Sequence, residues 1–268
     1  MHTHRYGPSR DQVADLWLPD GDVPETGWPV VVLVHGGFWR HQYVRALTEP
    51  LARDLTRRGF AAWNLEYRRV PPPDEVIDAA DRGGWPATLA DVAAGIDRLV
   101  DLDAPLDLAR VAFVGHSAGG HLALWAAGRT RLPDGAVGAA PRLRPAAVVG
   151  LAPAADLRAG ERDGMGSGAM AALLGGGSDD VPERWDLADP VRLVGHGVPV
   201  LLVHGDEDES VPPSQSQSYA EAVRAAGDEV EVATGPAEHM DVIDPDEPLC
   251  QRAAAWLAHR FEVPTVTP

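Results

Sequence analysis

The chain has 268 residues, which is enough for one large domain with a substantial core. Its formal net charge is −17, from 40 Asp and Glu against 23 cationic residues, all of which are arginine. Nucleic acid and anionic membrane surfaces both require clustered cationic side chains, so this balance argues against either as a partner. The lack of lysine also excludes a Schiff-base or Ser-Lys mechanism.

Further features bear on location and cofactors. No stretch approaches the roughly 18 apolar residues of a membrane helix, and the polar N-terminus lacks the apolar segment of a signal peptide. We therefore expect a cytoplasmic protein. Cys250 is the only cysteine, which excludes an internal disulfide and a cysteine-based metal cluster. We expect a small-molecule substrate, no cofactor and no metal, and a homodimer stays open as the assembly.

Short apolar runs alternate with amphipathic stretches along the chain. The apolar runs predict strands at residues 13–18, 29–35, 60–66, 111–115, 148–151, 200–204 and 229–233. The amphipathic stretches predict helices at residues 44–58, 88–100, 117–128, 214–226 and 248–261. Such alternation builds an α/β fold, a mostly parallel sheet with helices on both faces. Because no repeat or linker interrupts it, we predict one domain over residues 1–268.

Two regions break this alternation. Residues 70–85 contain three consecutive prolines and a glycine pair, which predict a long loop. Residues 154–194 hold two glycine-rich stretches around a short apolar helix at 169–174. This second region follows a predicted strand and is therefore expected at the edge where the motifs described below lie. We predict that it forms a small cap over the active site, with a disordered surface excursion as the alternative.

Residues 115–119 read Gly-His-Ser-Ala-Gly between a predicted strand and a predicted helix. A serine flanked in this way at a strand-to-helix junction is the nucleophile elbow of an α/β-hydrolase. The turn is tight enough to strain the Ser117 backbone, and side chains at 115 or 119 would collide with the neighbouring strand and helix. This strain is expected to present the Ser117 hydroxyl to both a base and a substrate.

A serine hydroxyl needs a base and an orienting acid, which follow it in the order acid, then histidine, in this fold. The segment after the strand at 200–204 reads Gly-Asp-Glu-Asp-Glu-Ser-Val-Pro. We predict Asp208 as the acid because many hydrolases of this fold carry it three residues before a Val-Pro pair. Asp206 stays open as an alternative. His239 is predicted as the base, since it is the only histidine between this segment and the closing helix.

Hydrolysis also requires an oxyanion hole, a pair of backbone N–H groups directed at the developing negative charge. One donor is predicted at Ala118, the residue after the nucleophile. The other is predicted in the glycine-rich turn His-Gly-Gly-Phe-Trp at residues 35–39, which follows an early strand. Either Gly37 or Phe38 could supply it, and the sequence does not decide between them.

Other conspicuous residues carry weaker expectations. Trp39 and Trp85 are predicted to line the substrate pocket, with core packing as the alternative for each. Arg68 or its neighbour could bind a carboxylate in bidentate fashion, with a structural ion pair as the safer interpretation. His35 and His116 are expected to brace their turns instead of reacting.

The combined motifs resemble the α/β-hydrolase esterases. They are most similar to the bacterial group that includes kynurenine formamidase (arylformamidase) and related carboxylesterases. The resemblance covers about residues 6–261 and rests on the turn at 35–40, Tyr67-Arg68, Trp85-Pro86 with Asp91, the elbow, the segment 204–212 and His239. Phe38 replaces the third glycine of other esterases, which is similar to formamidase-like members. The short, glycine-rich cap does not allow substrate contacts to be carried over.

The motifs predict a cofactor-independent serine hydrolase with Ser117, Asp208 and His239 as its triad. The resemblance implies small acyl esters or an N-formyl aryl amide as substrate, the latter yielding kynurenine in tryptophan breakdown. The alternative is a general short-chain carboxylesterase with no formamidase role. An exopeptidase, or a non-catalytic protein of the same fold that only binds a ligand, are the remaining alternatives.

Overall fold

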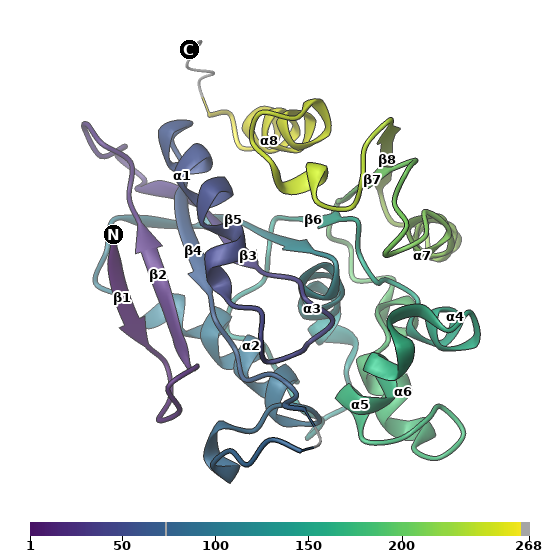
Figure 1. Cartoon of the computed structure of the whole chain (residues 1–268). Coiled ribbons are helices and arrows are strands. Elements are labelled where there is room, and N and C mark those ends of the chain that lie inside the picture. The colour runs from purple at the N-terminus through teal and green to yellow at the C-terminus, as the bar shows by residue number, and fades with distance from the viewer. Residues whose placement is uncertain (73, 264–268) are drawn as a thin grey trace.

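The computed structural model describes residues 1–72 and 74–263 and is built around an eight-stranded sheet (Figure 1). The strands lie in the order β1-β2-β4-β3-β5-β6-β7-β8. Their bounds are His2–Arg5, Val13–Trp17, Trp28–Val34, Ala61–Leu65, Leu106–His116, Ala147–Leu151, Val200–Gly205 and Val230–Gly235 for β1 to β8. β2 runs antiparallel to both β1 and β4, and the remaining pairs are parallel. The predicted mostly parallel sheet is confirmed.

Helices cover both faces of this sheet. One face packs against α1 (Glu49–Arg57) and α8 (Pro248–Arg260). The opposite face packs against α2 (Ala87–Asp97), α3 (Ala118–Ala127) and α7 (Ser214–Ala225). Because the parallel strands are buried on both sides, their carboxyl ends and the loops that follow them are held in fixed positions.

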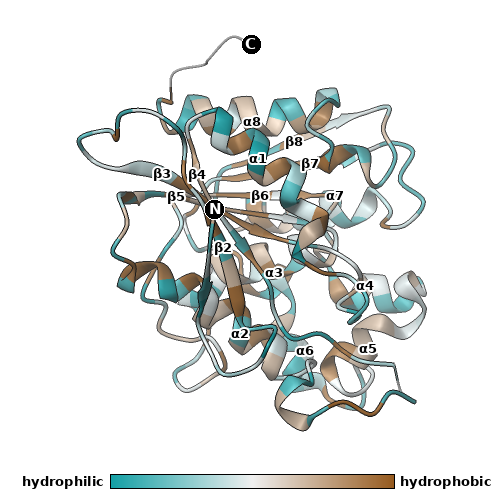
Figure 2. Cartoon of the chain, turned by 60° about the vertical axis from the view of Figure 1, so that its left-hand side comes forward, coloured by the Kyte–Doolittle hydropathy of each residue, from teal (hydrophilic) through white to brown (hydrophobic). Residues whose placement is uncertain are grey.

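The sequence of β3 explains this layering. Val30, Val32 and Val34 belong to the core on one side of the sheet, whereas Val31 and Leu33 belong to the core on the other. Successive side chains of a strand point to opposite faces, so an unbroken apolar run fills two cores at once. Figure 2 shows the hydrophobic central strands enclosed by helices whose outer faces are hydrophilic.

The cap, residues 154–194, is ordered and well packed. It contains α4 (Leu157–Arg162), α5 (Ala169–Leu174) and α6 (Pro182–Ala188), of which only α5 was expected from the sequence. The side chains of Leu157 and Trp185 are fully buried, which is incompatible with a disordered surface excursion. The two additional helices have only six and seven residues, too few for helical periodicity to be evident in the sequence.

The remaining differences from the predicted elements are small. β1 was not expected, because its residues, His-Thr-His-Arg, are polar and it lies at the edge of the sheet. The helix predicted at 44–58 begins with a 3-10 turn at Arg45–Thr48 and continues as α1. The segment 70–85 is a loop apart from a 3-10 turn at Ala79–Asp81, and Pro73 lies outside the described residues. Within the described residues, no helix combines the length and apolarity needed to cross a bilayer.

Candidate active site

Ser117 lies at the junction of β5 and α3 in a strained backbone conformation. Its φ and ψ are 57° and −121°, values that a residue with a side chain rarely adopts. A Cβ at Gly115 would lie 2.0 Å from the carbonyl oxygen of Gly119, and one at Gly119 would lie 2.1 Å from that of Val34. Both glycines are therefore required by close backbone approach, as the sequence predicted for an elbow.

His239 and Asp208 lie on the loops that follow two neighbouring strands. β7 and β8 pair in parallel and end at Gly205 and Gly235, so both loops leave the same edge of the sheet. His239 Nδ1 donates a hydrogen bond to Asp208 Oδ2 at 2.6 Å. Asp206, the alternative acid, is exposed. The structure thus brings Asp208 to the histidine, and the Nδ1–H bond leaves the lone pair of the ring on Nε2.

The Asp208 carboxylate is surrounded by donors. Oδ1 accepts the backbone N–H groups of Ser210 and Val211, each at 2.8 Å. Oδ2 lies 3.4 Å from Nε2 of His204, in addition to its bond from His239. Burial raises the pKa of this carboxyl, but hydrogen bonds from the two histidines and from Val211 outweigh burial and hold the pKa well below its usual range. Asp208 is therefore ionised at neutral pH and can stabilise a cationic imidazole.

His116 connects the serine turn to the histidine loop. Its Nε2–H donates to the carbonyl oxygen of His239 at 3.0 Å, and the two ring centroids lie 4.6 Å apart. Burial and the nearby His239 lower the pKa of His116 to about 3, so its ring is neutral. Gly36 approaches the same point, since a Cβ there would lie 2.9 Å from both His116 Nδ1 and Ser117 Cβ. The turn at Gly36 and the loop of His239 therefore both adjoin the turn that holds Ser117.

The turn at residues 35–39, here called the oxyanion turn, follows β3. Gly37, Phe38 and Trp39 are all left-handed, with φ values of 111°, 49° and 55°. This conformation is costly for the two aromatic residues and is typical of functional turns. Ala118 begins α3, so its N–H is one of the first four that a helix leaves without an internal acceptor. Gly36, at the start of this turn, is the residue that approaches Ser117, and the donor roles of Ala118 and of Gly37 or Phe38 remain predictions.

His35 supports the oxyanion turn from its buried side. Its Nδ1 lies 2.8 Å from the carbonyl oxygen of Gly36, and its Nε2 lies 2.9 Å from Oε1 of Glu66. The ring also stacks on Tyr67, with centroids 4.4 Å apart. Burial, with Arg69 nearby, lowers the pKa of His35 to about 3. Because both nitrogens are occupied and the ring is fully buried, His35 supports the turn instead of acting as a base.

The expectation that Trp39 lines the substrate pocket is corrected by its burial. The side chain is fully buried in the core, and its Nε1–H donates to Nδ1 of His121 at 3.2 Å. The left-handed backbone at this position turns the indole inward, so the core-packing alternative applies. Trp85 is half-buried, and its backbone N–H donates to Leu173 in the cap. Its contact with substrate remains a prediction.

The arginines after β4 form structural ion pairs. Arg68 binds Asp91 in bidentate fashion at 2.6 and 2.8 Å, and Asp91 is almost fully buried. Arg69 pairs with Asp11 at 3.0 Å and contacts Glu66. Both arginines are therefore engaged in ion pairs within the protein, in agreement with the structural interpretation.

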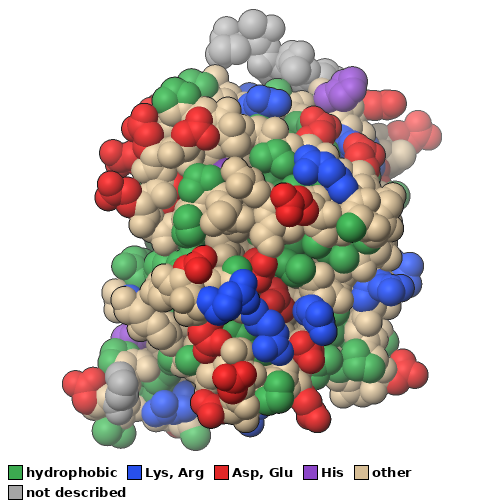
Figure 3. Space-filling model, turned by 90° about the vertical axis from the view of Figure 1, so that its right-hand side faces the viewer, with side chains coloured by type: hydrophobic (Ala, Val, Ile, Leu, Met, Phe, Trp, Pro, Cys, Tyr) green, Lys and Arg blue, Asp and Glu red, His purple; other side chains and the backbone are tan. Residues whose placement is uncertain are grey.

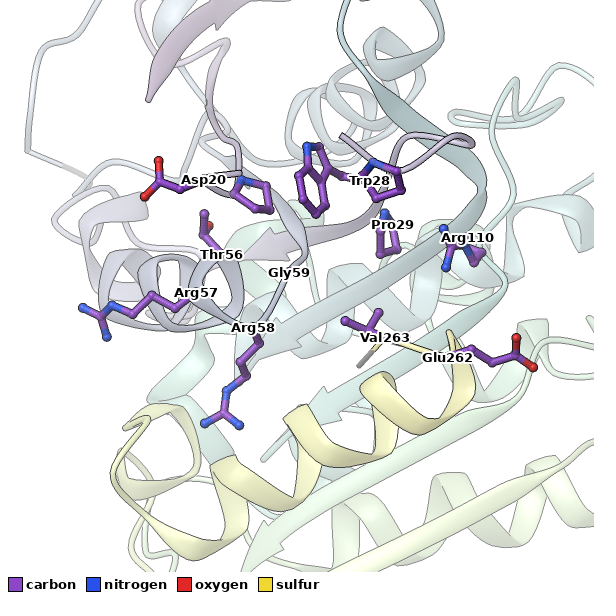
Figure 4. A pocket seen from close by; sticks show the side chains of 12 residues that line it. Asp20, Trp28, Pro29, Thr56, Arg57, Arg58, Gly59, Arg110, Glu262 and Val263 are labelled. Carbon is purple, nitrogen blue, oxygen red and sulfur yellow. The ribbon is translucent and has the colours of Figure 1, made fainter. Parts of the chain in front are cut away.

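Cavities lie at both edges of the sheet. One, of about 390 Å³, adjoins the oxyanion turn and is lined by residues that include Phe38 and Arg40. Another, of about 640 Å³, lies at the opposite edge, where Trp28 and Pro29 begin β3 (Figure 4). Ligands of parallel α/β sheets bind at the carboxyl ends of the strands, so only the smaller cavity is suitably placed for the chemistry.

Charged side chains of both signs share one face of the molecule. On the face that carries the cap and α7, acidic and arginine side chains are interspersed (Figure 3), as in the pair between Arg158 and Asp186 at 3.0 Å. Within residues 1–72 and 74–263, no group of three or more His, Cys, Asp or Glu side chains is arranged to hold a metal ion.

Sequence reasoning missed three residues that shape the site. His204, near the end of β7, contacts the Asp208 carboxylate. Glu66 contacts both His35 and Arg69. Arg40 reaches from the oxyanion turn to the cap, where its Nη2 donates to the carbonyl oxygen of Gly166 at 2.8 Å. His204 and Glu66 each stand at the carboxyl end of a predicted strand, and that position was the available signal.

Comparisons with known proteins agree with this geometry. A family model described as BD-FAE matches residues 14–223. Esterase LipQ of Mycobacterium tuberculosis is 28% identical over 235 residues, which are 83% of this chain and 52% of the relative. Esterase LipC of the same organism is 25% identical over 238 residues, 84% of this chain and 56% of the relative. The chain thus spans about half the length of these curated relatives.

Solved structures resemble the chain over nearly its whole length. A truncated carbohydrate esterase from gut microbiota has a TM-score of 0.81 at 20% identity, covering 97% of this chain and 96% of that one. Carboxylesterase Cest-2923 from Lactobacillus plantarum has a TM-score of 0.74 at 20% identity, covering 99% and 100%. At such identities the likeness establishes the fold, which is the α/β-hydrolase fold predicted from the sequence.

Proposed function

The chain belongs to the BD-FAE family, and from this membership and the geometry of its site we propose that it is a serine carboxylesterase. The observation that carries the proposal is the 2.6 Å bond from His239 to Asp208 at the edge that also holds the strained Ser117. That combination supplies a nucleophile, a base and an orienting acid.

The proposed reaction proceeds through an acyl-enzyme. Ser117 Oγ attacks the ester carbonyl carbon while His239 Nε2 takes the hydroxyl proton, which it then gives to the departing alcohol. N–H groups of Ala118 and of Gly37 or Phe38 stabilise the oxyanion. Water, deprotonated by His239, attacks the acyl carbonyl and releases the acid and Ser117. Asp208 remains ionised throughout and stabilises the cationic imidazole.

Esters are preferred to formamides as the proposed substrates. The relatives reported above are described as esterases, which supports the general carboxylesterase alternative. The formamidase interpretation came from the family resemblance, and the burial of Trp39 removes one of the two aromatic side chains predicted for the substrate pocket. N-formylkynurenine is therefore retained as a comparison substrate.

The test measures kcat/KM for 4-nitrophenyl acetate and for N-formylkynurenine, with Ser117→Ala as the blank. We expect the acetate to be preferred and the serine variant to lose about 10⁴-fold or more while keeping its fold by circular dichroism. A fluorophosphonate probe should label the wild type and not the variant. Equal labelling of both proteins, or full activity of the variant, would end the proposal.

A further inference from the structure

The cavity beside the oxyanion turn is bounded by three separate segments. It has a volume of about 390 Å³ and lies between the oxyanion turn, the loop after β4 and the cap. Phe38, one of the two candidate donors of the second oxyanion N–H, forms part of its wall. The cavity therefore adjoins the turn that carries this candidate donor.

The walls of the cavity are mainly apolar. They comprise Phe38, Val70, Pro71, Pro72, Ala169 and Ala172. Its polar side chains come chiefly from three consecutive residues, Arg40, His41 and Gln42, with Ser167 on the cap side. An apolar cavity with a few polar groups on one side is the usual form of a small-molecule site, in which the polar groups fix orientation and specificity.

Arg40 brings a positive charge into this cavity without a matching carboxylate. Its Nη2 donates to the carbonyl oxygen of Gly166 at 2.8 Å, and its guanidinium carbon lies 5.7 Å from the centre of the Phe38 ring. Of the residues that the structure describes, none places a carboxylate within ion-pair distance of it, whereas Arg45 and Arg68 nearby are paired with Asp15 and Asp91. Arg40 therefore keeps most of its five donors for a ligand.

His41 adds a second polar group at the same wall. Its Nε2 lies 3.3 Å from Oε1 of Glu75, whereas its Nδ1 is buried and has no hydrogen-bond partner among residues 1–72 and 74–263. Glu75 therefore holds the His41 ring at this wall of the cavity.

We propose that this cavity binds a carboxylate carried by the ester substrate, and that Arg40 makes this enzyme selective for such esters. The inference rests on the proposed function and adds the class of substrate. A carboxylate uses the planar guanidinium in bidentate fashion and balances its charge, which a neutral hydroxyl cannot do. The apolar walls hold the carbon chain or ring between the carboxylate and the ester.

Two matched pairs of esters test this proposal. 3-Acetoxybenzoate and 3-acetoxybenzamide differ only by the charge on the alcohol side. The mono(4-nitrophenyl) ester of adipic acid and its terminal amide differ in the same way on the acyl side. We expect the wild type to favour the carboxylate in one of the pairs by about tenfold or more in kcat/KM, because hydrogen bonds between charged groups are the strong ones.

Variants identify the residue responsible. Arg40→Gln keeps a donor for Gly166 and is expected to abolish the preference, lowering kcat/KM for the carboxylate ester at least tenfold further than for the amide. Arg40→Lys should restore part of the preference through its charge. Arg57→Gln removes the same charge at the opposite edge of the sheet, where Figure 4 shows its side chain directed away from Trp28, and should leave the preference unchanged.

Failure of this proposal is distinguishable from failure of the esterase proposal. A wild type that cleaves both members of each pair equally, or an Arg40→Gln variant that slows both equally, would overturn the carboxylate site and leave the esterase intact. If no ester is cleaved, binding to the Ser117→Ala variant is measured by calorimetric titration with 3-hydroxybenzoate and with 3-hydroxybenzamide. This comparison tests the carboxylate site independently of esterase activity. Binding of the benzoate alone, lost in Ser117→Ala with Arg40→Gln, supports the site, and equal binding or none overturns it.

Discussion

The pair formed by His239 and Asp208 differs from the pair formed by His35 and Glu66, although both lie at the same edge of the sheet. His239 donates to Asp208 at 2.6 Å, and His35 lies 2.9 Å from Glu66. Both carboxylates are buried and both accept backbone N–H groups. The distance between histidine and carboxylate and the burial of the carboxylate are similar in the two pairs. These two quantities alone do not show which pair could act as the base and acid of a hydrolase.

The second ring nitrogen distinguishes the two pairs. In His35 it faces the carbonyl oxygen of Gly36, and the ring is fully buried. In His239 the first nitrogen is fixed by Asp208, and 15% of the side chain remains exposed at the loop edge. A general base needs a free lone pair within reach of substrate, so the partner of the far nitrogen decides function more than the carboxylate does.

The largest contrast is expected from removing each histidine. His239→Gln should lower kcat by about 10⁴-fold or more with little change in Tm, because it deletes the base. His35→Gln should instead lower Tm, because it removes contacts that support the oxyanion turn. We expect kcat per folded molecule to fall by roughly tenfold or less. Turnover of 4-nitrophenyl acetate and thermal melts measure both. A greater loss of kcat in the His35 variant would reverse the assignment.

The acid is tested by a pair of neighbouring substitutions. Asp208→Asn should cost about 10³- to 10⁴-fold in kcat, because an amide no longer holds the productive tautomer or stabilises the imidazolium. Asp206→Asn, two residues away and exposed, is the matched control and should be within about twofold of wild type. Equal losses in the two variants would show that the loop and not the carboxylate matters.

Glu66→Gln should act on stability more than on turnover. Glu66 lies 2.9 Å from His35 Nε2, accepts the backbone N–H groups of Arg45 and Tyr67, and contacts Arg69. Removing its charge leaves a buried arginine incompletely compensated, which should cost about 3 kcal/mol of unfolding free energy. Urea unfolding measures this, and an unchanged midpoint would contradict the bracing role.

A further effect concerns the dependence of stability on pH. Burial lowers the pKa values of His35 and His116 to about 3 and that of His121 to about 4. Their unfolded values lie near 6.5, so between about pH 4 and 6.5 the unfolded chain binds more protons and stability falls as pH falls, by about 1.4 kcal/mol per unit for each histidine. Asp208 acts in the same direction at lower pH, since its stabilisation is lost only below its unfolded pKa near 3.9.

A histidine outside the triad isolates this contribution. His121 bonds to Trp39 and to the carbonyl oxygen of Ala188, and His121→Gln should make the fall of Tm between pH 7 and 4.5 shallower. Thermal melts over that range provide the measurement. If the Tm of the variant falls as steeply as that of the wild type, His121 does not contribute to the loss of stability at low pH.

Local sequence determined much of this molecule. The apolar runs gave the central strands to within a few residues, because a strand buried on both faces has no polar positions to obscure it. Gly115 and Gly119 identified the elbow, since backbone contacts near 2 Å tolerate no side chain. The order of Ser117, Asp208 and His239 predicted the triad, because in parallel sheets successive loops emerge at the same edge.

Tertiary structure decided what depends on contacts distant in the chain. The sequence favoured Asp208 and left Asp206 open, and the position of the His239 loop, which pairing of β7 with β8 sets, brings Asp208 to the histidine. The inward rotation of Trp39 follows from its left-handed backbone and from His121 on α3. The lack of a carboxylate partner for Arg40 depends on which acids fold nearby. Sequence encodes short-range conformation and order along the chain, whereas the partner of each polar atom is fixed only when distant segments pack.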